Sequence, residues 1–162
     1  MRRAAARAPL LALLLLAGGC GFQLQGRAPL PAVVKYPYVE APDRQTDFVQ
    51  SLRHALLTNG AQIAPAQADS SAVISILQDQ LVRRTVSVSA SNQPNLYEIT
   101  YTVRFQVSKG GDELLAPQEL VATRQYTFQE PELLAKGHEE DVLRADMARD
   151  LADRVLRLLT KL

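Results

Sequence analysis

Few residues in this chain are of the types that catalyse reactions or bind metal ions. It has one cysteine, Cys20, and two histidines, His54 and His138, that lie far apart in the sequence. It contains no G-x-S-x-G, H-E-x-x-H or P-loop motif, and neither histidine belongs to a cluster at metal-ligand spacing. The adjacent acids at 139–141 point in different directions around a helix, and their position at its start already explains them. We therefore expect a non-enzymatic protein that needs no cofactor and no metal.

Three cations are candidates for binding an anionic ligand. Arg83 and Arg84 come late in the second predicted strand, and Lys136 lies in the loop ELLAKGHEED before the last predicted helix. Guanidinium and ammonium groups bind phosphate and carboxylate through charge-assisted hydrogen bonds. The alternative for each residue is plain surface charge, which is the commoner role of Arg and Lys.

The first 20 residues, MRRAAARAPLLALLLLAGGC, predict an export signal that ends at a lipidated cysteine. Basic residues precede an apolar run at 10–17, which is about half of the roughly 20 residues that a membrane-spanning helix needs. The segment LAGGC resembles the lipobox of bacterial lipoproteins, and acylation of Cys20 explains a lone thiol in an exported protein. The alternative is an ordinary secreted protein with an unpaired cysteine.

The composition predicts one small domain after the leader is removed. Three of the 18 basic residues lie in the leader, so the remainder has 15 basic and 17 acidic residues. Such a chain is not expected to bind nucleic acid, and an acidic ligand would have to be bound by a few placed cations. We divide the chain into a leader at 1–19, a lipidated tether rich in Pro and Gly at 20–32, and a single domain at 33–162.

Hydrophobic periodicity predicts six elements in the order β, α, β, β, β, α. They are expected at 33–40, from Asp43 to the Asn59-Gly60 stop, and at 72–89, 97–108, 113–128 and 139–162. The two glycines of Lys109–Asp112 predict a hairpin turn, and Pro117 predicts a bulge or break in the last strand. The economical packing is an α/β (α+β) two-layer sandwich, with both helices on one face of a mostly antiparallel four-stranded sheet.

Alternation of residue types predicts which face of each strand lies under the helices. The strand at 97–108 alternates apolar with polar residues over its whole length, which indicates one buried face and one solvated face. Its apolar set is Tyr97, Ile99, Tyr101, Val103, Phe105 and Val107. In the preceding strand, the same rule assigns Ile74, Ile76, Val82, Val86 and Val88 to the buried face. It assigns Ser75, Asp79, Arg83, Thr85 and Ser87 to the solvated face.

The last helix is expected to pack through a stripe of apolar residues that recur every three or four positions. The stripe consists of Leu143, Met147, Leu151, Val155, Leu158 and Leu162. Three acid-first pairs four residues apart are expected to stabilise the helix by a few tenths of a kcal/mol each. These pairs are Glu140 with Arg144, Asp150 with Arg154 and Asp153 with Arg157.

The polar face of the sheet is the main candidate for an interaction surface. It would present Thr100, Thr102 and Arg104 along a strand about 40 Å long. One alternative is that this face is simply solvated, as one face of an antiparallel sheet often is. Insertion of the apolar hairpins into a membrane is disfavoured, because three long strands cannot close a barrel and would leave edges unpaired.

Three segments give the chain a resemblance to a known family. CGFQLQG after the lipidation site, the YEITYTV strand with its hairpin, and EPELLAKGHEEDVLRADMARDLADRVLRLL resemble the LPS-assembly lipoprotein family (LptE, also called RlpB). The resemblance implies a two-layer sandwich that plugs the LPS-assembly barrel LptD one to one, binds lipopolysaccharide (LPS) and helps the barrel fold. It also implies LPS contact by Lys136, which matches the Lys of the family's LAK segment.

The chain departs from the family pattern in two places. Gln25 stands where the opening motif usually has Arg, and the turn at 89–95 lacks the expected cation, so that Arg83 or Arg84 would have to replace it. Gly21 after Cys20, by resemblance to enteric lipoproteins, implies sorting to the outer membrane. We thus expect a lipid-anchored outer-membrane protein on the periplasmic side and in the barrel lumen. The alternatives are an accessory lipoprotein of a phospholipid ABC transport system and an envelope hydrolase, which the lack of a nucleophile disfavours.

Overall fold

The computed structural model of the chain describes residues 29–127 and 133–162, apart from the side chains at 133–139. Its helices and strands follow the predicted order β, α, β, β, β, α, and two short 3-10 turns, η1 (Ala32–Val34) and η2 (Gln67–Asp69), accompany them. The main elements are β1 (Pro37–Glu40), α2 (Asp47–Thr58), β2 (Ala72–Val88), β3 (Pro94–Lys109), β4 (Asp112–Thr127) and α3 (Leu133–Leu159). Cys20, the leader and the tether as far as residue 28 lie outside the described residues.

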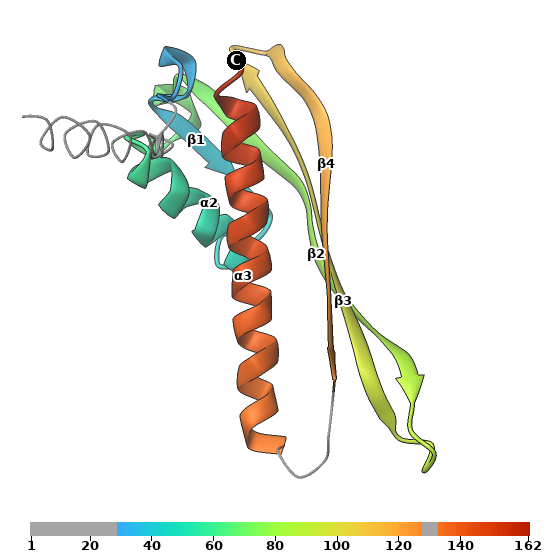
Figure 1. Cartoon of the computed structure of the whole chain (residues 1–162). Coiled ribbons are helices and arrows are strands. Elements are labelled where there is room, and N and C mark those ends of the chain that lie inside the picture. The colour runs from blue at the N-terminus through green and yellow to red at the C-terminus, as the bar shows by residue number, and fades with distance from the viewer. Residues whose placement is uncertain (1–28, 128–132) are drawn as a thin grey trace, which may run out of the picture.

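The four strands form one sheet in the order β1-β2-β3-β4. β1 is parallel to β2, because α2 carries the chain back between them, whereas β2, β3 and β4 are joined as antiparallel hairpins. Both helices lie on the same side of the sheet, with α3 running along its length (Figure 1). The predicted two-layer, mostly antiparallel architecture is therefore confirmed.

The core lies between the sheet and the two helices. The periodicity predicted for α2 and α3 is observed, because their buried residues recur at helical spacing: Phe48, Leu52 and Leu56, then Met147, Leu151, Val155 and Leu159. They pack against the apolar residues of β3, of which Ile99, Tyr101, Val103, Phe105 and Val107 are all buried. Thr46 is the N-cap of α2, accepting a hydrogen bond from the backbone of Val49.

The face assignment of β2 is correct for Ile74 and Ile76 and wrong from Asp79 to Thr85. Leu77 is an extra residue opposite β3, since Ile76 pairs with Phe105 and Gln78 pairs with the next residue along, Arg104. This β-bulge exchanges the two sets of side chains that follow it. As a result Val82, expected in the core, is exposed. Val86 and Val88 were also expected in the core; they lie at two further register shifts and are exposed as well. Asp79 and Arg83, expected in solvent, lie on the helix side instead, opposite Val103 and Ile99.

The ends of several elements also differ from their prediction. α3 begins at Leu133 and not at 139, which places Lys136 within the helix rather than in a preceding loop. α2 begins four residues after Asp43, at its Thr46 cap, and Leu162 lies beyond the end of α3. The hairpin turn is confirmed, with positive φ at Gly110 and Gly111, and Pro117 lies at a shift in the register of β4.

No helix in the described part of the chain is sufficiently long and apolar to cross a membrane.

Candidate functional site

The sheet face opposite the helices is uncovered by any described element, and we call it the open face. Cross-strand pairing builds it from four rows of side chains. The rows are Gln78, Arg104 and Glu119; Gln80, Thr102 and Val121; Val82, Thr100 and Thr123; and Arg84, Glu98 and Gln125. The structure thus brings Thr100, Thr102 and Arg104 together on one surface, as the sequence predicted. It adds two exposed valines, Val82 and Val121, that the parity argument did not place there.

Glu98 organises the polar end of the open face. Its carboxylate accepts hydrogen bonds from Arg84 at 2.7 Å and from Gln125 at 2.9 Å, so that one residue on β3 joins its neighbours on β2 and β4. The bond from Gln125 and then that from Arg84 lower the pKa of Glu98 below its ordinary value. Arg84, a candidate for binding an anion, is therefore held on the open face by an ion pair, yet its side chain remains 70% exposed.

Arg83 occupies the other face and belongs to a cluster around Glu140 of α3. Its guanidinium lies 2.9 Å from Glu140 Oε2 and 5.1 Å from the ring centroid of Tyr97. The same Glu140 oxygen accepts a hydrogen bond of 2.7 Å from the hydroxyl of Tyr126, whose ring stacks on Tyr97 at 5.5 Å. Burial and then the bond to Glu140 raise the pKa of Tyr126 to about 12. We call these four residues the Glu140 cluster; it ties the first half of α3 to all three long strands.

This cluster changes the pairing predicted within α3. Glu140 pairs with Arg83 and not with Arg144, which instead contacts Asp47 of α2 at 2.6 Å and Asp141 at 3.1 Å. The pair of Asp150 and Arg154 is confirmed at 2.6 Å. The reason is that contacts between elements compete with pairs along one helix, which are worth only a few tenths of a kcal/mol.

One cation of this region was missed by sequence analysis. Arg124 shares a cross-strand row with Arg83, with Ile99 between them, and is exposed on the helix side of the sheet. A signal was present, because Arg124 interrupts the apolar series of Ala122 and Tyr126 at the buried parity. Lys136 lies one helical turn before Glu140 along α3, and its side chain is outside the described residues.

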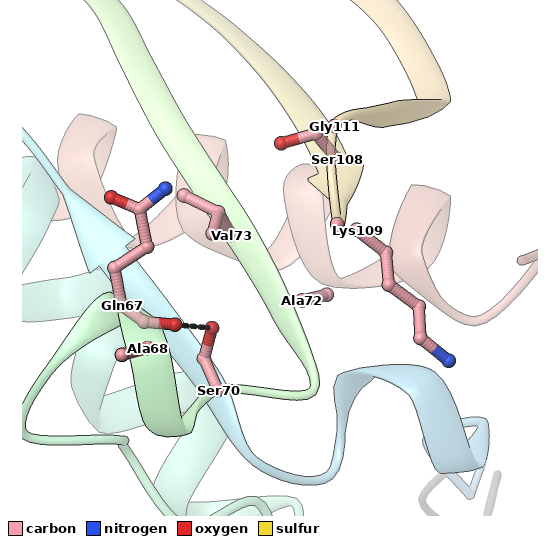
Figure 2. Close-up of a pocket in the computed structure, with 9 residues that line it drawn as sticks. Gln67, Ala68, Ser70, Ala72, Val73, Ser108, Lys109 and Gly111 are labelled. Carbon is pink, nitrogen blue, oxygen red and sulfur yellow. Dashed lines mark hydrogen bonds between the residues drawn. The ribbon is translucent and has the colours of Figure 1, made fainter.

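A pocket that was not predicted lies at the opposite end of the sheet. It has a volume of about 560 Å³ and lies between η2, the start of β2 and the turn between β3 and β4. Figure 2 shows Ser70 donating a hydrogen bond to the carbonyl of Gln67 on one side, and Lys109 extending from the end of β3. Among the described residues, no cluster of three His, Cys, Asp or Glu could hold a metal ion, and His54 is exposed.

A family model decides which family this fold and surface belong to. The model described as "LptE: Lipopolysaccharide-assembly" matches residues 35–159, which is most of the chain and nearly all of its described part. The chain belongs to the LptE family. A curated LptE relative from Pectobacterium atrosepticum, named LPS-assembly lipoprotein LptE, is 25% identical over 90% of this chain and 79% of its own. A second, from Photorhabdus laumondii, is 26% identical over the same shares. The relatives are thus named as assembly lipoproteins and not as enzymes.

Solved structures agree with this assignment. A lipoprotein B from Nitrosomonas europaea is 29% identical to this LptE-family chain, with a TM-score of 0.72 over 86% of this chain and 90% of its own. The rare lipoprotein B from Shewanella oneidensis is 27% identical, with a TM-score of 0.66 over 78% and 94%. A minor lipoprotein from Acinetobacter baumannii, 23% identical over 81% and 94%, has the same fold at a TM-score of 0.66.

Proposed function

We propose that this LptE-family chain is an outer-membrane lipoprotein that plugs the LPS-assembly barrel LptD, assists its assembly and binds LPS in transit. Acylation of Cys20 would anchor it from the periplasmic side, and the tether would let the domain at 33–162 enter the barrel lumen. The observation that carries the proposal is the open face, a long sheet surface of Thr, Gln, Arg and Val that the helices leave uncovered. Family membership favours the LPS system over phospholipid transport.

The open face suits a protein wall better than a lipid surface. It interleaves side chains of both charge signs with hydroxyl groups and β-branched methyl groups, so it can match hydrogen bonds and shape on a polar lumen. A plug that binds only the folded barrel would stabilise that barrel by mass action. The barrel-facing residues we propose are Thr100, Thr102 and Arg104.

The docking claim is tested by crosslinking in intact cells from photoreactive groups placed at Thr100, Thr102 and Arg104. We expect adducts with LptD from these three positions and none from Leu57, an exposed residue of α2 on the helix side. Co-purification from membranes should yield a one-to-one complex. Adducts from Leu57 alone, or failure of the two proteins to co-purify, would rule out the plug in this orientation.

The LPS claim concerns cations at the end of the sheet where α3 begins. We propose that Lys136 and Arg84 bind LPS phosphate groups. Both arginines are paired, Arg83 with Glu140 and Arg84 with Glu98, but the side chain of Arg84 is 70% exposed against 51% for Arg83. Arg84 is therefore the better replacement for the cation that the turn at 89–95 lacks. Lys136→Asp and Arg84→Asp should each weaken LPS binding without lowering the melting temperature by more than about 3 °C. Lys109→Asp, at the other end of β3, is the matched control, and equal loss in all three variants would contradict a localised site.

A further inference from the structure

We infer that the outer edge of β2, from Leu81 to Val88, is a strand-addition site for an extended, acidic segment of a partner protein. The segment would continue the sheet as a new strand on the far side of β2 from β3. Such an edge is a surface distinct from the open face, because its groups are backbone N–H and C=O and they point within the plane of the sheet.

This edge has no strand beside it in the described part of the chain. β1 pairs only with the first four residues of β2, Ala72–Ser75. The chain that follows β1 covers the next stretch, where the Thr46 hydroxyl donates to Asp79. From Leu81 onward β2 continues past both of these segments (Figure 1), and residues 82–88 are all exposed.

The opposite edge of the sheet is treated differently. On β4 the backbone carbonyl of Val121 accepts a hydrogen bond of 3.2 Å from Arg154 of α3. The helix therefore occupies part of that edge. Among the described residues, no hydrogen bond from outside the β2–β3 pair reaches the backbone of Leu81–Val88. Natural sheets usually cover or interrupt an exposed edge of this length, because its unpaired N–H and C=O groups can pair with another chain. An open edge is therefore a candidate binding site for an extended segment.

The edge is also held in an extended form before any partner arrives. Pairing with β3 is regular from Gln78 to Thr85, and the register then shifts twice, between Thr85 and Ser87 and between Ser87 and Val88. Arg83 is fixed to Glu140 on one face and Arg84 to Glu98 on the other. A strand that is already ordered loses little conformational entropy on binding, which favours addition of a short segment.

The side chains along the edge indicate what the added strand carries. Val82 and Val86 are 48% and 43% exposed and would contact β-branched or apolar residues of the new strand. No acidic residue lies between Asp79 and Glu98 in the sequence, and Nε and Nη2 of Arg84 both contact the same oxygen of Glu98, Oε1. Its remaining donors can therefore serve a second carboxylate. A second copy of this chain is a poor occupant, because antiparallel pairing would set Arg83 and Arg84 of the two copies against one another.

The test uses amide hydrogen exchange of the full mature lipoprotein with two probes. The first is a capped eight-residue peptide in which valine occupies every second position and glutamate or threonine the positions between. Its control peptide has lysine in place of glutamate. The second probe is the purified LptD barrel, and only this one rests on the proposed function. With either probe we expect protection of the outward-pointing amides of Leu81–Val88, at every second residue along the regular part that ends at Thr85. The lysine peptide should bind about tenfold more weakly.

Two variants distinguish binding at the edge of β2 from binding on the open face. Val82→Asp places a carboxylate beside the added strand and should weaken the glutamate peptide about tenfold, whereas Val121→Asp, two strands away on the same face, should change it by less than about twofold. A stronger effect at Val121, a homodimer formed through β2, or no protection of Leu81–Val88 by either probe overturns the inference. If the barrel does not bind but the peptide protects the edge, the proposed function fails and the strand-addition site stands.

Discussion

The Glu140 cluster gives a prediction whose magnitude can be worked out from its contacts. Glu140→Ala removes the acceptor of the Tyr126 hydroxyl, and Tyr126 is only 6% exposed, so the loss of that hydrogen bond is worth about 1.5 kcal/mol. It also removes the ion pair with Arg83, whose partners are 51% and 25% exposed, and solvent screening limits this to about 0.5 kcal/mol. The sum is about 2 kcal/mol.

Glu140→Gln is the matched variant, since the amide oxygen can still accept from Tyr126 while the charge is lost. We expect about 1 kcal/mol for this change. For a chain of this size, the two variants should melt about 6 °C and 3 °C below the parent protein, as followed by circular dichroism. Asp153→Ala, an exposed acid on the same helix, should shift the melting temperature by less than about 1 °C.

A double-mutant cycle decides whether the cluster acts as described. Glu140→Ala and Tyr126→Phe remove the two ends of one hydrogen bond, so their effects on the free energy of unfolding should fall short of additivity by about 1 kcal/mol. Additive effects, or equal losses for Glu140→Ala and Glu140→Gln, would show that this carboxylate does not bind Tyr126. Either result would refute the reasoning.

Three further predictions follow from single contacts. Because the pKa of Tyr126 is raised to about 12 from its ordinary value of 10, the contribution of Tyr126 to stability is fully present below pH 10 and is lost as the pH rises from 10 to 12. Tyr126→Phe should therefore lose less stability than the parent over that interval in urea unfolding. Because the pKa of Glu98 is lowered, its contribution is present above its ordinary value of 4.5 and is lost as the pH falls below it. Glu98→Gln should therefore show a shallower acid decline in urea midpoint than the parent. Thr46→Ala removes the cap of α2 and the donor to Asp79 and should cost about 1–2 kcal/mol, while Thr46→Ser should cost less than half of that in the same unfolding assay.

The sequence predicted the element order, the layers and the face of β3 because each depends on local periodicity. Tyr97 to Val107 alternate without interruption, and the predicted apolar stripe of α3 holds from Leu143 to Val155. At the end of the helix Leu159 is buried in place of Leu158, which is partly buried, and Leu162, which is exposed. The three positions on β3 chosen as the candidate docking surface follow from that regular pattern, and they do lie on one face.

The features that the sequence did not predict depend on contacts between segments that are distant in the chain. No local rule marks Leu77 as an extra residue, because a bulge is defined by the partner strand. The extra residue Leu77 places the side chains of Asp79 and Arg83 on the helix side of the sheet. There Thr46 contacts Asp79 and Glu140 contacts Arg83. A charged residue among apolar residues of the same parity, as at Arg124, indicated that the helix side of the sheet also carries polar contacts.

The bulge at Leu77 also bears on how substitutions along β2 should be tolerated. Up to Ile76 the even-numbered positions of β2 face the helices, and from Asp79 to Thr85 the odd-numbered ones do. A saturation scan should therefore place the substitutions that disturb contacts with α2 and α3 on even positions before Leu77 and on odd positions from Asp79 to Thr85.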